Sequence, residues 1–170
     1  MEFVKCSIEQ LSPLRTLALA SYQDHYTHLW SDQGAHYLNT QYSRVALENA
    51  LGDPNVEIYL IEEGQEKSGF VKIVLDSGIG SYSPQDTLEL EKIYFLKKST
   101  RKGIGKQSLH FVEKRALELK KSYIWLKSMA FGPVIAFYKK NGFQIIREEK
   151  LKSAYVLDQY RDMYVWIKKV

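Results

Sequence analysis

The chain has 170 residues, of which 45% are hydrophobic and 26% are charged. This length suits one domain at roughly 100–200 residues per domain, and the composition excludes a disordered, collagen-like or coiled-coil protein. No apolar run approaches the roughly 18–20 residues of a membrane span, and the segment MEFVKCSIEQ lacks the features of a signal peptide. We therefore expect a single domain over residues 1–170 that is soluble and cytoplasmic and has no membrane partner.

The net charge of +4 hides a strong asymmetry along the chain. Residues 1–96 carry 6 Lys and Arg against 14 Asp and Glu, a net charge of −8, whereas residues 97–170 carry 18 against 6, a net charge of +12. This pattern suggests one anionic and one cationic surface with different partners, although solvated surface charge would look the same. The single cysteine, Cys6, excludes an intrachain disulfide and a cysteine-based metal cluster.

The first half of the chain predicts one strand, two helices and an antiparallel hairpin. In chain order, hydrophobic periodicity and turn residues place these elements at 3–8, 12–26, 37–51, 56–61 and 69–75. Pro13 falls in the first turn of the first helix, where its missing N–H group has no helical partner to lose. The short turn around Gly64 makes the last two strands an antiparallel pair.

The second half of the chain predicts four strands and two helices. In chain order, the elements are expected at 88–95, from about 104, 123–126, 133–142, 143–150 and 157–168. The resulting order, β-α-α-β-β-β-α-β-α-β-β, is typical of helices packed on one twisted mixed sheet.

A glycine-containing loop follows the strand 88–95 and opens the next helix with Gly103-x-Gly105. Glycine allows a close backbone approach, and the free N–H groups and dipole of a helix N-terminus favour phosphate. Residues 97–121 hold nine Lys and Arg against two acidic residues, which favours phosphate over a plain tight turn. A P-loop spacing is absent, and a dinucleotide fingerprint would need glycine in place of Ser108.

The stretch from Leu88 to Phe143 resembles the acetyl-CoA core of the GNAT superfamily of N-acetyltransferases. The resemblance is carried by LELEKIYF, STRKGIGK, IWL and IAFYKKNGF, and within the superfamily it is greatest to the bacterial PaiA-type spermine/spermidine acetyltransferases. It implies an α/β (α+β) fold whose central twisted sheet is mixed, mostly antiparallel and about seven-stranded, with four or so helices around it. It also implies acetyl-CoA as the cofactor and coenzyme A as the product.

The resemblance also implies where the cofactor binds. The pyrophosphate is expected on the amides of the loop from Thr100 to Gly105, with Thr100 in the place of the family's usual Gln or Arg. Ile93 and Phe95 correspond to the strand positions whose main chain binds the pantetheine arm, and Phe131 stands where an Asn often touches the cofactor. The predicted cofactor contacts are Ile93, Tyr94, Phe95, Thr100, Arg101, Lys102, Gly103, Ile104, Gly105, Lys106, Phe131 and Tyr138.

Acetyl transfer to an amine needs a base, a polarised thioester carbonyl and a proton for the leaving thiolate. Glu89 and Glu91 lie two apart on the strand 88–95, so both point to one face if the strand is regular. The resemblance favours Glu89 as the general base; Glu91, a water relay and a merely solvated pair of carboxylates are the alternatives. Tyr138 corresponds to the family's general acid, although a tyrosine on the apolar side of a helix is often only a core residue.

The expected acceptor side lies in the acidic half of the chain. Asp24, His25, Tyr26 and Trp30 form a cluster of carboxylate and aromatic residues that suits an extended cation such as a polyamine. His25 and His28 have a spacing compatible with metal ligation, but with no third ligand we expect no metal.

Three alternatives to a small-molecule acceptor remain. In the first, the enzyme acetylates a protein N-terminus or a lysine side chain. In the second, the chain binds acyl-CoA without turnover. In the third, the basic helix 104–121 binds nucleic acid. The expected partner is a small-molecule amine and not nucleic acid, and the sequence leaves a homodimer open.

Overall fold

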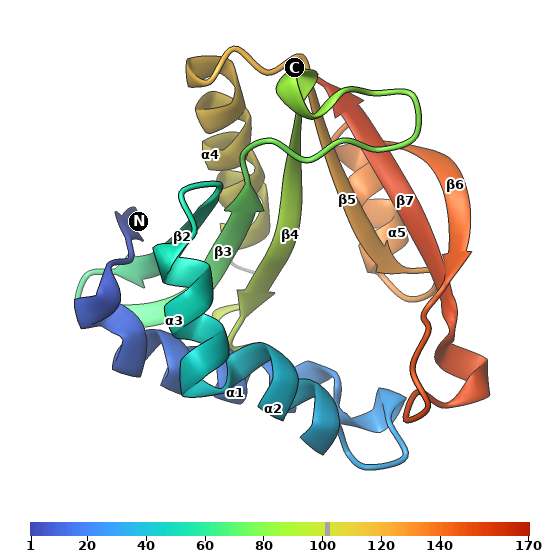
Figure 1. Cartoon of the computed structure of the whole chain (residues 1–170). Helices are drawn as coiled ribbons and strands as arrows, with labels where there is room; N and C mark the ends of the chain where they lie inside the picture. Colours follow the sequence, from blue (N-terminus) through green and yellow to red (C-terminus); the bar gives the residue numbers. More distant parts are fainter. Residues whose placement is uncertain (101–102) are drawn as a thin grey trace.

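The computed structural model describes residues 1–100 and 103–170. Within them the chain forms a seven-stranded sheet and five α-helices (Figure 1). The strands are β1 (Glu2–Lys5), β2 (Val56–Glu63), β3 (Glu66–Val74), β4 (Thr87–Phe95), β5 (Tyr123–Met129), β6 (Gln144–Lys150) and β7 (Asp162–Lys169). The helices are α1 (Leu11–His25), α2 (Ala35–Tyr42), α3 (Arg44–Gly52), α4 (Ile104–Glu118) and α5 (Val134–Lys140). Short 3-10 turns are η1 (Ile8–Gln10), η2 (Thr27–Leu29), η3 (Pro84–Asp86), η4 (Lys97–Ser99) and η5 (Asp158–Tyr160).

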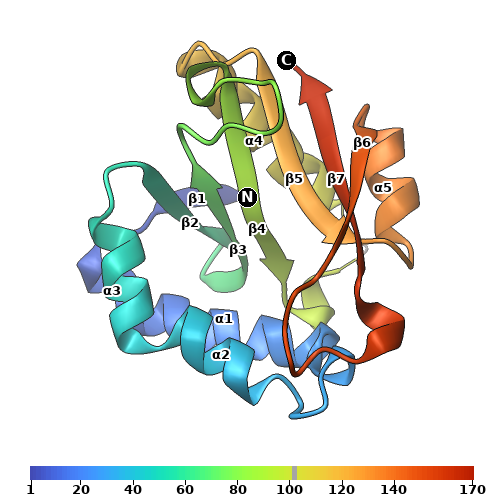
Figure 2. The same cartoon turned by 45° about the vertical axis from the view of Figure 1, so that its right-hand side comes forward.

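The strands lie in the order β1-β2-β3-β4-β5-β7-β6, and only β4 and β5 are parallel. Their pairing runs from Thr87 opposite Tyr123 to Glu89 opposite Trp125 and then ends. Beyond this point the two strands diverge toward α1 and α2, as Figures 1 and 2 show. The predicted mixed, mostly antiparallel sheet of seven strands is therefore confirmed, and it is split at its only parallel pair.

Helices cover both faces of the sheet, which explains why five consecutive residues of β2, from Glu57 to Ile61, are buried. Its Tyr59 and Ile61 pack in one core cluster with α4, whereas Ile58 and Leu60 pack in a second cluster with α1, α2 and α3. Alternate residues of a strand point to opposite faces, so a strand buried on both faces loses the polar alternation of an exposed one.

The prediction of a single helix over 37–51 is wrong, because the chain forms two helices there, α2 and α3. Ser43 has an extended backbone between them, with φ of −61° and ψ of 157°, and its side chain accepts a hydrogen bond from the Ala46 N–H group at 3.2 Å. Serine in this conformation caps the N-terminus of a helix, so α3 starts anew at Arg44. The last strand also begins later than expected, at Asp162, because a 3-10 turn occupies 158–160.

A β-bulge interrupts the pairing of β3 with β4. Lys72 lies opposite Lys92 and Ile73 lies opposite Leu90, so that Glu91 has no residue opposite it. Leu90 and Ile93 both contact the core cluster under α4, which leaves two consecutive residues, Glu91 and Lys92, between them. The regular alternation expected for 88–95 therefore fails at Glu91.

Among residues 1–100 and 103–170, no helix is both long and apolar enough to cross a bilayer. No group of three or more His, Cys, Asp and Glu side chains among them is arranged to hold a metal ion.

Candidate active site

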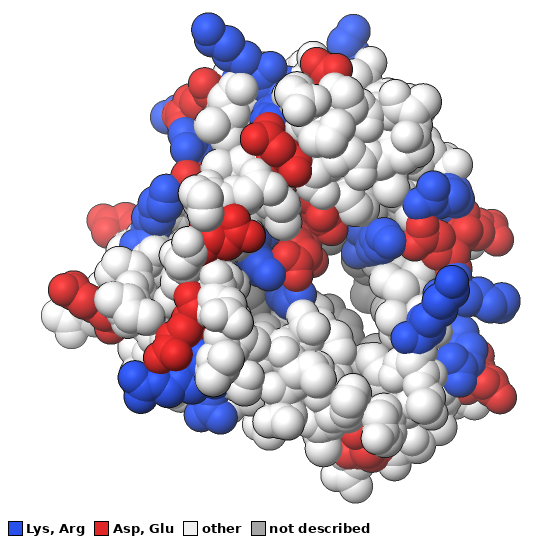
Figure 3. Space-filling model, viewed as in Figure 1, with Lys and Arg blue, Asp and Glu red and all other residues white. Residues whose placement is uncertain are grey.

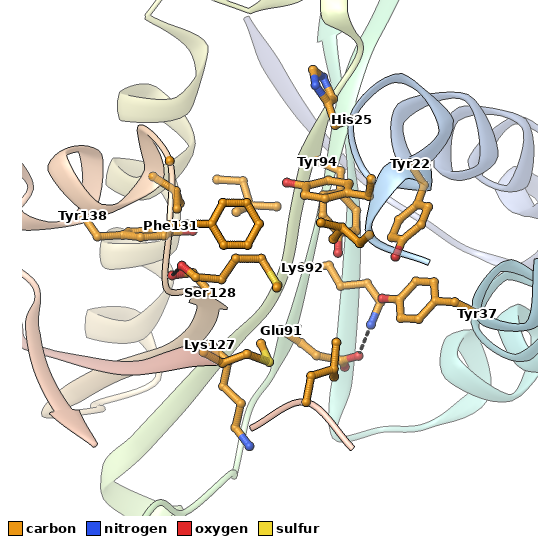
Figure 4. A pocket seen from close by; sticks show the side chains of 18 of the residues that line it. Tyr22, His25, Tyr37, Glu91, Lys92, Tyr94, Lys127, Ser128, Phe131 and Tyr138 are labelled. Carbon is orange, nitrogen blue, oxygen red and sulfur yellow. Dashed lines mark hydrogen bonds and ion pairs between the residues drawn. The ribbon is translucent and has the colours of Figure 1, made fainter. Parts of the chain in front are cut away.

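A cavity of about 500 Å³ lies where β4 and β5 separate. One wall comes from β4, from the end of α1, from α2 and from the chain between these helices, and the other comes from β5, α5 and the segment before α5 (Figure 4). In the space-filling view of Figure 3 the molecule is hollowed between these two halves. The lining side chains used below are Tyr22, His25, Tyr26, His28, Trp30, Tyr37, Glu89, Glu91, Lys92, Tyr94, Lys127, Phe131 and Tyr138.

Glu89 is a half-buried carboxylate at the point where the two strands part. Its Oε2 atom accepts a hydrogen bond from the Ser77 hydroxyl at 2.8 Å. Burial raises the pKa of Glu89 above its ordinary value, the bond from Ser77 opposes that change, and the nearby charge of Glu91 adds to it. Glu89 therefore takes up a proton more readily than an exposed glutamate does.

Glu91 lies in a different electrostatic environment, although it lines the same cavity. Burial alone would raise its pKa, but Lys92 at 2.5 Å and Lys72 at 2.7 Å lower it below the ordinary value. Lys92 is only 8% exposed, and its own pKa is raised: burial opposes that rise, while Tyr37 and Glu91 produce it. Glu91 is thus held as a carboxylate between two lysines, in a charge cluster that the β4 bulge builds.

Tyr138 reaches the cavity from α5, on the wall opposite Glu91 and Lys92 in Figure 4. Its ring packs against Phe137, Phe143 and Trp166 with centroid separations of 5.2, 5.5 and 5.7 Å. The side chain is 5% exposed, and burial raises the pKa of its hydroxyl. The hydroxyl is therefore protonated at neutral pH and can act as a proton donor.

The glycine loop lies at the end of η4 and leads into α4. Gly103 has a positive φ of 78°, which glycine adopts without strain, and it immediately precedes the helix. A Cβ atom at Gly105 would lie 3.1 Å from the Phe137 ring, so glycine allows α4 and α5 to approach closely. The first amides of α4, at Ile104, Gly105 and Lys106, lack helical partners and can donate to an anion, so the pyrophosphate site stays a prediction.

The other predicted loop residues lie in different settings. Thr100 donates from its hydroxyl to the Lys97 carbonyl oxygen at 2.8 Å, which closes the turn before the loop. Ile104 is a core residue at 3% exposure, whereas Lys106 is exposed. Arg101 and Lys102, predicted to supply the contact that Thr100 lacks, lie outside the described residues.

The predicted pantetheine strand has one edge paired and one edge facing the opening. Ile93, Tyr94 and Phe95 lie opposite Val71, Phe70 and Gly69 of β3. On the other side, the pairing of β4 with β5 ends at Glu89. The main chain of Ile93 to Phe95 therefore borders the gap between the strands, where an extended ligand can add to the sheet edge.

Three of the four predicted acceptor residues line the cavity, and Asp24 does not. His25 lies with its Nε2 atom 3.2 Å from the Phe95 carbonyl oxygen, and Tyr26 lies beside Tyr94 with a centroid separation of 5.2 Å. Trp30 is largely buried and donates from its indole nitrogen to the Tyr22 hydroxyl at 2.7 Å. Asp24 instead accepts a hydrogen bond from the Lys97 backbone N–H at 2.8 Å, so it ties α1 to the turn after β4.

Phe131, predicted as a cofactor contact, lies on the rim of the cavity at 37% exposure, and its ring is 5.2 Å from that of Tyr160.

Sequence reasoning missed Tyr22, Lys92 and Ser77 as parts of this site. Tyr22 lies in the last turn of α1 and Tyr26 is its C-cap residue, four positions later, a spacing that places both on one face of a helix and was a usable signal. Ser77 stands in a loop, and no local pattern marks it as the partner of Glu89.

Residues 16–143 match the acetyltransferase (GNAT) family. The chain therefore belongs to that family, which confirms the resemblance found in its sequence.

Individual relatives agree with this assignment. An uncharacterized N-acetyltransferase from the pepI 3′ region of Lactobacillus delbrueckii subsp. lactis is 28% identical over 92 residues, which are 54% of this chain and 53% of that protein. The match thus spans about half the length of this curated relative. The crystal structure of PaiA N-acetyltransferase from Thermoplasma acidophilum in complex with coenzyme A superimposes with a TM-score of 0.76 at 23% identity, over 99% of this chain and 98% of that one. A GNAT acetyltransferase from Elizabethkingia anophelis with acetyl-CoA bound gives a TM-score of 0.59 at 18% identity, over 75% and 84%. These two structures share the fold.

Proposed function

We propose that the protein transfers the acetyl group of acetyl-CoA directly to the primary amine of a small molecule. The observation that carries this proposal is the convergence of Glu89 from β4 and Tyr138 from α5 on one cavity, where the parallel pair of β4 and β5 opens. One group has a raised carboxyl pKa and suits a base, and the other is a protonated phenol that suits an acid. Membership of the GNAT family supports the same reaction class.

The residues around the cavity fit the cosubstrate. The amides at the start of α4 suit its pyrophosphate, and the free edge of β4 from Ile93 to Phe95 suits its extended arm. Acetyl-CoA supplies the activated acetyl thioester. Phe131 and Tyr138 border the opposite wall of the cavity.

In the proposed step, the amine enters as an ammonium ion and gives one proton to Glu89, directly or through one water. The amine nitrogen then forms a C–N bond with the thioester carbonyl carbon, and the C–S bond breaks. The departing thiolate takes the hydroxyl proton of Tyr138, which regains a proton from the acylated nitrogen. The proton on Glu89 returns to solvent, so an ammonium ion and acetyl-CoA give an amide, a thiol and one released proton.

Among small acceptors, the sequence favours a polyamine or similar small cationic amine. The aromatic side chains of Tyr26 and Trp30 at the cavity and the carboxylate of Glu89 support binding of one ammonium group, which a polyamine and a monoamine both provide. A protein N-terminus or lysine and an acyl-CoA-binding role without turnover are the two other functions that the same fold allows.

Thiol release from acetyl-CoA, measured with a panel of acceptors, tests the proposal. The panel contains monoamines, spermidine, spermine, aminoglycosides, amino acids and short peptides, and acetylated products are quantified by mass spectrometry. We expect release to require a small amine and to yield one acetylated amine per thiol. A large preference for peptides would favour the protein acetyltransferase, whereas coenzyme A binding with no transfer to any amine would favour the binding module.

A further inference from the structure

The charged groups that line the cavity are already paired, with one exception among the described residues. Its acidic side chains are Glu89 and Glu91. Glu91 is held by Lys72 and Lys92, and Lys127 pairs with Glu149 at 2.7 Å. Glu89 accepts a hydrogen bond from a neutral hydroxyl and forms no ion pair within 4 Å among the described residues, although the charges of Lys127 and Lys92 act on it from farther away. The cavity therefore offers one carboxylate to an incoming cation.

The acidic residues just outside the cavity are engaged as well. Asp24 accepts from the backbone of Lys97, as described above. Asp32 accepts from the N–H groups of Gly34 at 3.0 Å and His36 at 2.8 Å, where it precedes α2. These carboxylates stabilise turns and helix ends, so they do not extend the anionic surface of the cavity.

The rest of the acceptor side is aromatic and uncharged. Tyr37 stacks on Tyr22 at 4.5 Å and on Trp30 at 5.3 Å, and Tyr94 lies 5.9 Å from Tyr22. Figure 4 shows Tyr22, Tyr37 and Tyr94 together on the wall opposite Phe131 and Tyr138. Aromatic faces of this kind bind apolar and aromatic groups, and they stabilise a nearby cation only modestly.

We propose that the acceptor is a primary amine with a single cationic group and an aromatic or apolar body. This inference rests on the proposed function and names its substrate class. The reacting ammonium group of such a molecule meets Glu89, and its uncharged body lies against the tyrosines. A polyamine would bring further ammonium groups to a wall with no free carboxylate, where an unpaired charge loses its hydration without compensation.

A matched set of acceptors tests the inference with the full-length protein and acetyl-CoA. The set pairs 2-phenylethylamine and hexylamine, each with one charge, with 1,5-diaminopentane and spermidine, which have two and three. We expect kcat/KM for the two monoamines to exceed that for the diamine and for spermidine by at least tenfold. Equal or higher kcat/KM with spermidine or the diamine overturns the inference and leaves the proposed function standing. Absence of transfer to all four amines would also overturn the inference, whereas the proposed function fails only if no small amine of the wider panel is acetylated.

A gain-of-function variant provides an independent measurement. His28 is exposed at the cavity, so His28→Glu places there a second carboxylate that is not paired with a lysine, without disturbing the core. We expect this variant to raise kcat/KM for a series of α,ω-diamines relative to hexylamine by at least fivefold at one chain length. His110→Glu adds the same charge at an exposed position on α4 outside the cavity and is expected to leave the ratio unchanged. An unchanged ratio in His28→Glu, or an equal rise in both variants, would contradict charge-limited selection.

Discussion

At the scale of single residues, two glutamates on one strand have opposite electrostatic properties. Burial with only a neutral hydroxyl as partner raises the pKa of Glu89, whereas two lysines lower the pKa of Glu91 below its ordinary value despite burial. A base must exchange protons near neutral pH, which favours the group with the raised pKa. Glu91 instead offsets the charge of Lys92 and Lys72 and so stabilises the bulge.

This difference predicts that Glu91→Gln lowers the stability of the fold and that Glu89→Gln does not. In Glu91→Gln, Lys92 is left buried without its carboxylate, so we expect a loss of about 2 kcal/mol in the free energy of unfolding. In Glu89→Gln, burial no longer disfavours a charge, so stability at pH 7 is expected to be unchanged or slightly higher. Urea unfolding of both variants measures this, with Glu148→Gln on the exposed face of β6 as the control. Equal stabilities in Glu91→Gln and the wild type would contradict the assignment.

The hydroxyl of Tyr138 is expected to matter for the rate and not for the fold. Its ring provides the packing against Phe143 and Trp166, and Tyr138→Phe keeps that ring. We expect kcat to fall at least tenfold at pH 7, because the thiolate loses its proton donor. Steady-state kinetics with a saturating amine measures this, and Tyr155→Phe at an exposed position serves as the control. A kcat within twofold of the wild type would rule out the acid role.

The sequence identified candidate residues that the fold brings to one cavity, but it did not identify the contacts between them. Glu89, Glu91, His25, Tyr26, Trp30, Phe131 and Tyr138 were all candidates, and all line the cavity. The pairing of Glu91 with Lys72 was not predictable, because Lys72 comes from β3 and the contact depends on the strand register. The capture of Asp24 by the Lys97 backbone likewise depends on how α1 packs against η4.

At the scale of elements, β4 combines three features that the site needs. Its first residues pair with β5, its bulge turns Glu91 and Lys92 toward the acceptor side, and its last residues border the gap. The strand itself and the hairpin before it were predictable from alternating apolar residues. The bulge was not predictable, because it is a property of the register between β3 and β4, which alternation within one strand does not contain.

The break between α2 and α3 could have been predicted from the capping residue Ser43, and this cap leads to a prediction about stability. Ser43 caps α3 through its side chain, so Ser43→Ala is expected to lower the free energy of unfolding by about 1 kcal/mol. Ser12→Ala, an exposed change inside α1, is expected to be neutral or slightly stabilising because alanine favours helix. Thermal unfolding of both variants measures the difference, and equal melting temperatures would show that the cap contributes nothing.

At the scale of the whole molecule, the acidic and basic halves of the sequence fold against each other. Glu57 of β2 binds Arg115 of α4 at 2.8 Å, Asp76 binds Lys121, and Glu66 binds Lys98 at 2.8 Å. Three acidic residues of the first half are therefore paired with basic residues of the second half and are not free to bind a polycation.

The pair of Glu57 and Arg115 predicts a specific pH dependence of stability. Glu57 is 4% exposed, and although burial would raise its pKa, hydrogen bonds from Arg115, Lys5 and Tyr59 lower it to about 2. A lowered carboxyl pKa stabilises the fold above the ordinary value of 4.5, and this contribution is lost as the pH falls toward about 2.

We therefore expect Glu57→Gln to lose about 3 kcal/mol at pH 7 and to approach the wild type as the pH falls from about 5 to about 3. Urea unfolding across this pH range measures the convergence. The surface pair of Arg44 and Glu48 is the control, since Glu48→Gln is expected to change stability by less than about 0.5 kcal/mol. A difference between Glu57→Gln and the wild type that stays constant with pH would contradict the ion-pair origin.

In the proposed reaction, the Glu89 carboxylate of β4 removes the proton of an amine in the cavity between β4 and β5. The most direct test is kcat/KM for acetyl transfer to one monoamine, measured for the wild type and Glu89→Gln from pH 6 to pH 9. We expect the variant to be at least 100-fold slower at pH 7, with the gap narrowing as the pH rises and more of the amine, whose pKa is about 10, is already free of its proton. Rates within twofold of each other across this range would contradict the claim.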